Sequence, residues 1–145
     1  MLENLRSNSQ TFSYHGNIAG TVNDGTALHP IKLDGYNSFA MNVSFGAANP
    51  IQVTEVKFNT ANNIYTVTSS GISTQSAFSG QAVNAIPTAI TSNGFNAAAD
   101  WGSGANFMNI VGKFYGSAAE SAGGAWSGSF NSGALQGVGV FKARR

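Results

Sequence analysis

Hydrophobic and polar residues alternate most clearly between Thr11 and Val22. One alternate set is mainly apolar and includes Phe12, Tyr14 and Ile18, whereas the other set is mainly polar. Successive side chains of a β-strand point to opposite faces of its sheet. This period of two therefore predicts a strand with one face toward a core and the other toward water.

Similar segments follow along the rest of the chain, rich in β-branched and aromatic residues and separated by Asn, Asp and Gly. Such spacing is typical of many short strands joined by turns. With the first segment they predict an all-β protein of about eight strands. The further predicted strands are Ile31–Phe45, Ile51–Asn59, Ile64–Ser70, Ala77–Ala85, Asn106–Tyr115, Gly124–Phe130 and Ala134–Arg144.

Short turn signals separate these strands and favour antiparallel neighbours. They lie at 23–25, 49–50, 62–63, 93–94 and 131–133, and consist of residues that accept a positive φ or bond to their own backbone. An open sheet of eight strands would leave two edges exposed, whereas an up-and-down barrel pairs every strand. We therefore predict an eight-stranded antiparallel up-and-down β-barrel over residues 11–145, preceded by a flexible lead-in at residues 1–10.

The last three predicted strands alternate glycine with large apolar residues on one face, as in Gly112 and Phe114, or Gly137 and Phe141. Glycine lets a strand coil sharply and leaves room for a ring from across the interior. The simplest interpretation of these aromatic residues, including Trp126, is therefore core packing.

Two segments depart from the strand pattern. Ser117 to Ala122 has Ser at a helix N-cap position and Glu120 three residues later, which predicts one short helical turn before the last two strands. The stretch 88–104 is the least strand-like part of the chain, and we expect a long loop over one barrel mouth.

Composition narrows the function classes. The 145 residues are 42% hydrophobic and 9% charged, with a formal net charge of +1 and no cysteine. This balance offers no basic stripe for phosphates, so we predict no nucleic-acid partner. No apolar run approaches the ~20 residues of a membrane helix, so we predict no transmembrane segment. The lack of cysteine excludes thiolate metal sites, thiol nucleophiles and disulfides.

Catalytic patterns are scarce in the sequence. The two histidines, His15 and His29, have no metal-ligand spacing around them, and no G-x-S-x-G nucleophile motif occurs. The six acidic residues stand singly, without the D-x-D spacing of a calcium loop. We therefore predict neither an enzyme nor a metal site.

The C-terminal third resembles a known family through the stretch GKFYGSAAESAGGAWSGSF, residues 112–130, and the closing segment GALQGVGVFKARR. These motifs are similar to the C-terminal end of the barrel domains of the transferrin-binding protein B family. Trp126 stands where that family usually has Phe. The matching residues are Gly112, Phe114, Tyr115, Gly116, Ala119, Glu120, Gly123, Gly124, Ser127, Gly128, Phe130, Phe141 and Arg144.

The resemblance implies an eight-stranded antiparallel barrel and a non-enzymatic binding domain of a bacterial surface or secreted protein. Such a domain would recognise a partner or host protein through its barrel loops. It also implies an extracellular or cell-surface location for a fragment or mature form. The missing signal peptide and N-terminal cysteine depart from the lipoprotein pattern of the family.

Two alternatives remain open: a haem carrier of the same barrel family, and a structural or secretion cap domain of a larger protein. Haem iron takes a His or Tyr axial ligand among others. A haem or other ligand site would draw on residues near strand ends or mouth loops. These ligand-binding candidates are His29, His15, Tyr36 and Trp101.

Overall fold

The computed structural model describes residues 2–47, 50–61, 66–68, 94–101 and 106–145, and these residues form one antiparallel sheet with a short helix before it. Alternating burial along the strands, as in β7, agrees with the alternation in the sequence. The elements are α1 (Leu2–Ser7), β1 (Thr11–Asn23), β2 (Leu28–Pro30), β3 (Ser38–Ser44), β4 (Ile51–Asn59), β5 (Thr66–Thr68), β6 (Gly94–Trp101), β7 (Asn106–Tyr115), β8 (Ser121–Phe130) and β9 (Leu135–Arg144).

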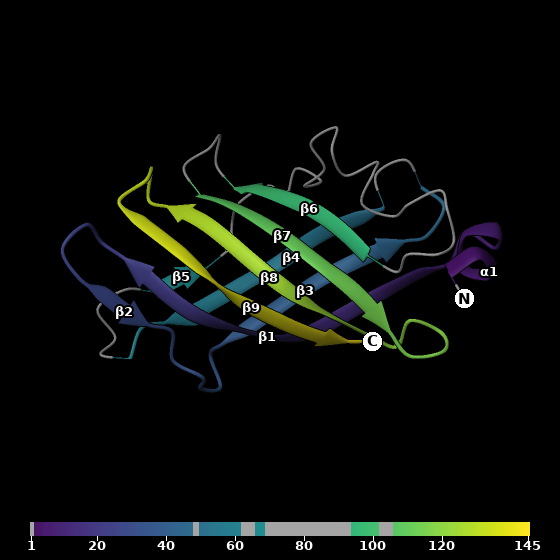
Figure 1. Cartoon of the computed structure of the whole chain (residues 1–145), viewed down its shortest axis with the longest axis horizontal. Helices are drawn as coiled ribbons and strands as arrows, with labels where there is room; N and C mark the ends of the chain where they lie inside the picture. The colour runs from purple at the N-terminus through teal and green to yellow at the C-terminus, as the bar shows by residue number, and fades with distance from the viewer. Residues whose placement is uncertain (1, 48–49, 62–65, 69–93, 102–105) are drawn as a thin grey trace.

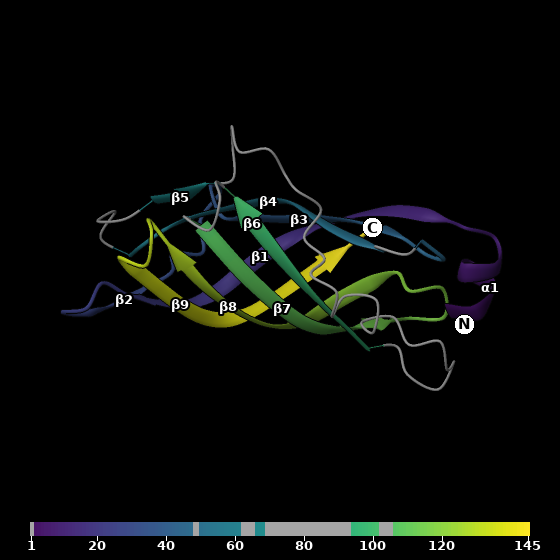
Figure 2. The ribbon, with the colours of Figure 1, turned by 90° about the horizontal axis from the view of Figure 1, so that it is seen from above.

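Eight strands follow one another in the order β5-β4-β3-β1-β9-β8-β7-β6, and the short β2 pairs with β1 beside this path. The ladder between β1 and β9 joins the first long strand to the last one. The sheet is curled, so that β4 contacts β6 even though they lie near opposite ends of the strand order (Figure 2). The prediction of an all-β, eight-stranded antiparallel up-and-down fold is confirmed.

The core fills the concave side of this curled sheet. The alternate residues of β1 that the sequence assigns to one face include Tyr14, Ile18 and Val22, and all three are buried. The phenylalanine rings stack from strand to strand, with Phe95 and Phe114 at 4.7 Å between ring centroids and Phe39 and Phe141 at 4.9 Å.

Glycine leaves room for these rings, as the sequence predicts. A Cβ atom at Gly137 would lie 2.6 Å from Cη2 of Trp126, and one at Gly112 would lie 2.8 Å from Cζ of Phe95. Such contacts are far closer than atoms tolerate, so no larger residue fits at either position without a shift of the ring.

One prediction about the strands is wrong. Residues 94–101, expected within a mouth loop, form β6, which pairs along its whole length with β7. Its alanines are buried, so small side chains here reflect close packing rather than a loop. The predicted strand Ala77–Ala85 lies outside the described residues, and the predicted strand Ile31–Phe45 is interrupted by a turn at Asp34 before β3 begins.

The two ends of the barrel wall also differ in detail from the expectation. The turn before β8 is closed by one bond from Ala119 N to Gly116 O, and Ala119 has a positive φ of 58°, so the segment is a tight turn and the predicted helical turn does not form. The residue 1–10 lead-in contains the short helix α1. Leu5 of this helix is buried against the core because it is the apolar side chain that faces the sheet.

Candidate functional site

The candidate site lies on the outer wall, where four strands reach the same end of the sheet. Strand register places Asn23 of β1, Gln136 of β9, Ser129 of β8 and Phe107 of β7 in one row across the wall. Because side chains two positions apart share a face, the next outward row also crosses these four strands. This second row consists of Thr21, Val138, Ser127 and Asn109.

These two rows, with Leu28 of β2, line an open groove of about 480 Å³. Its floor is low because the outward residues of β8 here, Ser127 and Ser129, are small, and Gly128 and Gly137 line it with their backbone. Hydroxyl and amide side chains alternate with the apolar Leu28, Phe107 and Val138 around it. Among the described residues that line the groove, none is ionisable, so its chemistry is hydrogen bonding and apolar contact.

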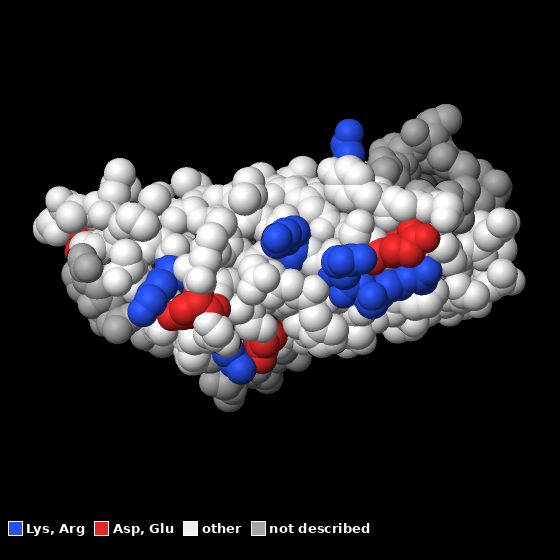
Figure 3. All heavy atoms as spheres, turned by 90° about the horizontal axis from the view of Figure 1, so that it is seen from below, with Lys and Arg blue, Asp and Glu red and all other residues white. Residues whose placement is uncertain are grey.

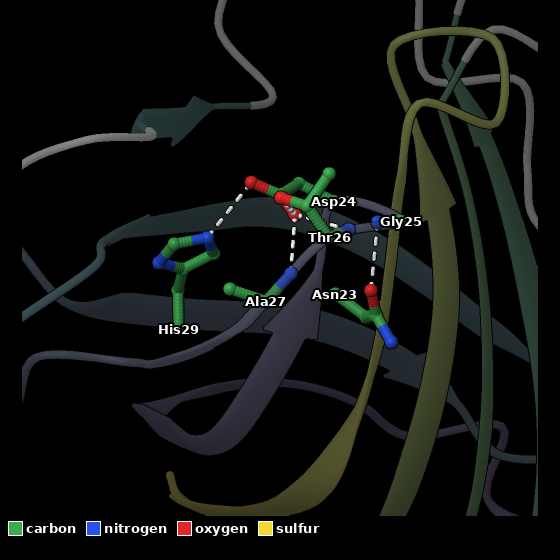
Figure 4. A network of polar contacts seen from close by, with 6 residues as sticks. All are labelled: Asn23, Asp24, Gly25, Thr26, Ala27 and His29. Carbon is green, nitrogen blue, oxygen red and sulfur yellow. Dashed lines mark hydrogen bonds and ion pairs between the residues drawn. The ribbon is translucent and has the colours of Figure 1, made fainter.

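A tight turn after β1 borders the groove and is held by the carboxylate of Asp24 (Figure 4). One oxygen, Oδ1, accepts bonds from Thr26 N at 2.8 Å, Thr26 Oγ1 at 2.6 Å and Ala27 N at 2.8 Å. The other oxygen lies 2.9 Å from Nε2 of His29 on β2. An Asp that bonds to the backbone of its own turn fixes the course of the chain there.

These bonds lower the pKa of Asp24 well below its usual range. The hydroxyl of Thr26 has the largest effect, followed by the His29 ring and the backbone N–H groups of Thr26 and Ala27. Each of them stabilises the ionised carboxylate. Asp24 is therefore charged throughout the neutral and mildly acidic range, and the turn stays closed.

A second, smaller hollow of about 380 Å³ adjoins the groove between this turn and the turn that joins β8 to β9. Asn23, Asp24 and Gly25 form one side of it, and Gly133 and Ala134 form the other. Gln136 lines both hollows, so a ligand in the groove would reach the two turns without a gap.

The structure places the four ligand candidates from the sequence at separate positions along the chain's strands and turns. His29 lies on β2, paired with Val22 and close to Asp24, while His15 is exposed on the outer face near the middle of β1. Tyr36 is exposed in the turn before β3, and Trp101 ends β6 opposite Asn106. His29, His15 and Tyr36 do not line either hollow.

Asn37 is a residue that the sequence reading missed. Its buried amide bonds to both backbone groups of Ile18, accepting from the N–H at 3.0 Å and donating to the carbonyl at 2.8 Å. It also donates to the carbonyl of Lys32 at 3.0 Å. This side chain takes the place of a strand partner just before β3 begins. The sequence pattern places Asn37 inside the predicted strand Ile31–Phe45, so it gives no signal for this role.

Among the described residues, no group of three or more His, Asp or Glu side chains is placed to hold a metal ion. No helix in the described part of the chain is long and apolar enough to cross a membrane.

Fold and groove together define an all-β domain with a groove lined by uncharged residues at one end of its wall. No protein-family model matches the chain, and no curated protein matches it. Similar solved structures include two mutant forms, one double and one single, of the vaccine antigen transferrin-binding protein B from Haemophilus parasuis Hp5. Both superpose with a TM-score of 0.50, at 18% and 17% sequence identity.

The aligned region covers 94% of this chain and 26% of the transferrin-binding protein B chains, so this chain spans about a quarter of their length. At this low identity the likeness shows a shared fold. It confirms the fold that the C-terminal motifs predict.

Proposed function

We propose that this chain is a non-enzymatic binding domain of a bacterial surface or secreted protein, and that it recognises a segment of a partner protein through the groove and its two bordering turns. The observation that carries the proposal is the groove itself, which combines hydroxyl, amide and apolar side chains on a rigid sheet. Protein interfaces use this mixture of apolar contact and uncharged hydrogen bonding.

Two further observations support this function. The turn at Asp24 is fixed by four polar contacts, so the groove is largely formed before a ligand arrives, which lowers the entropic cost of binding. Transferrin-binding protein B, which shares the fold, carries binding in its name, and this supports the same class of function here.

The test is selection of a displayed random peptide library on the purified full chain, with affinities then measured by fluorescence anisotropy. Ser127→Arg places a long side chain on the groove floor, and we expect it to weaken binding of the selected peptides at least tenfold. Leu33→Arg is the control because Leu33 is exposed in a loop and does not line the groove. Equal loss in both variants, or no loss in either, would contradict the proposal.

A further inference from the structure

Beyond the groove, a row of small outward residues continues along β8 between β7 and β9, and we call this row and its flanks the trough. The residues of β8 that point outward here are Ser121, Gly123 and Ala125. They alternate with residues that point inward, of which Ala122 and Trp126 are buried. All three are small. The floor therefore stays low from the groove to the other end of the strand.

Larger side chains flank this floor on both sides in matching order. Register across β8 pairs Val111 of β7 with Val140 of β9, Lys113 with Lys142, and Tyr115 with Arg144. The two flanking strands lie about 10 Å apart across β8, and the ten residues of β8 extend over about 33 Å. A single extended peptide segment has these dimensions. In Figure 1, β7, β8 and β9 run side by side in this order.

The flanks change in character along the trough. Next to the groove they are apolar, with Val111 61% and Val140 58% exposed. Farther along they are cationic, with Lys113, Lys142 and Arg144 all exposed.

No carboxylate of the described residues forms a salt bridge with these three cations. The salt bridges in the described part of the chain are His29 with Asp24, Lys32 with Asp34, and Lys57 with Glu55. Glu120, just before β8, is bonded instead to Ala118 N and Ser117 Oγ in its own turn. Figure 3 shows that charged side chains gather in a few places on a surface that is otherwise uncharged.

We propose that the trough binds one extended, acidic segment of the partner protein, with its uncharged part in the groove and its Asp or Glu residues between Lys113, Lys142 and Arg144. This inference rests on the proposed function and names the chemistry of the partner. Charge complementarity selects the acidic segment, and the apolar flanks select a protein over a polysaccharide. A bilayer suits the trough less well, because the valines are shorter than the lysines beside them and would not reach the hydrocarbon.

The test again selects a displayed random peptide library on the full chain, now at 0.15 M salt. We expect the enriched peptides to carry several Asp or Glu residues beside apolar ones. The double variant Lys113→Glu with Lys142→Glu should bind these peptides at least about tenfold more weakly, and added salt should also lower their affinity for the wild-type chain. Lys32→Glu with Lys57→Glu is the control, since it changes the net charge equally on residues outside the trough. Ala125→Gln fills the floor without changing the charge and should also weaken binding.

Each of the other possible results would contradict the acidic trough, the proposed function or both. Ser127→Arg could abolish binding of the enriched peptides while the charge reversals at Lys113 and Lys142 leave binding unchanged. That result would overturn the acidic trough and keep the proposed function. Equal weakening by the two double reversals would also overturn it, because the effect would then come from net charge. Failure to enrich any peptide would overturn both proposals. Binding to phosphatidylglycerol vesicles with no acidic peptide enriched would assign the cations to a membrane and refute the inference.

Discussion

The packing of Trp126 against Gly137 is the contact whose energetics the structure defines most sharply. A Cβ atom at Gly137 would lie 2.6 Å and 2.9 Å from two atoms of the indole ring and 3.0 Å from Cγ1 of Val22. Ordinary contacts lie near 3.5 to 4 Å, so the ring would have to move by about 1 Å. We expect Gly137→Ala to lower the free energy of unfolding by about 1 to 3 kcal/mol, the usual cost of overpacking.

Trp126→Phe perturbs the same site from the other side. It removes the part of the ring that meets Gly137, and it also removes the bond from Nε1 of Trp126 to the carbonyl of Ala19, 3.0 Å long. We expect a loss of about 2 to 4 kcal/mol from the vacated volume and the unpaired carbonyl. In the double variant the new methyl group enters space that the indole has left. The loss of stability in the double variant should therefore be smaller than the sum of the two single losses, by at least about 1 kcal/mol.

The assay is urea unfolding at 25 °C followed by far-ultraviolet circular dichroism, for the wild type, both single variants and the double variant. Gly35→Ala is the matched control, because a Cβ atom there meets nothing within 4 Å. It should leave stability unchanged or raise it by up to about 1 kcal/mol. A neutral Gly137→Ala, or strict additivity in the double variant, would refute the packing described for Trp126.

Four further predictions test other parts of the structure. Burial raises the pKa of Tyr14 to about 12, with smaller effects of Arg145 and Glu120. The unfolded chain therefore loses this proton first, and the free energy of unfolding should fall as pH rises from about 10 to 12. Tyr14→Phe should lack this pH dependence, and at pH 7 it should cost about 1 to 3 kcal/mol through the lost bond to the carbonyl of Ala119. Asn37→Ala should lower the free energy of unfolding by about 2 to 4 kcal/mol in urea unfolding, since two buried bonds and one partly buried bond are lost. The lowered pKa of Asp24 contributes stability above pH 4 that is lost as pH falls further, and Asp24→Asn should remove this acid-dependent part of the unfolding curve. In a titration with haemin, the absorbance spectrum should show no Soret shift that depends on His29 or His15. A Soret shift that is lost in His29→Ala or in His15→Ala would establish the haem-carrier alternative.

Much of the fold follows from the sequence because its signals are local. Alternation of apolar residues from Phe12 to Val22 reflects the period of a strand, and the structure places those residues in the core. The predicted bounds of the strands at Ile51–Asn59 and Asn106–Tyr115 match β4 and β7. The turn signals at 49–50 and 62–63 lie on either side of the first of these two strands.

The errors and omissions have a common physical origin in long-range pairing. Residues 94–101 contain three consecutive alanines with low strand preference, and their strand forms because β7 supplies a full ladder of partners. Asn37 bonds to Ile18, which is far away in the sequence. The groove combines outward residues from four strands, and strand register, which decides which of them are neighbours, cannot be deduced from any one segment.

The most direct test of the proposed site is nuclear magnetic resonance mapping of a selected peptide on the isotopically labelled full chain. The account predicts shifts of backbone amides along β8, in the facing parts of β7 and β9, and in the turn at Asp24, with the amides of β3 and β4 unchanged. Shifts confined to β3 and β4, or to residues that line only the interior, would show that the groove is not the binding site.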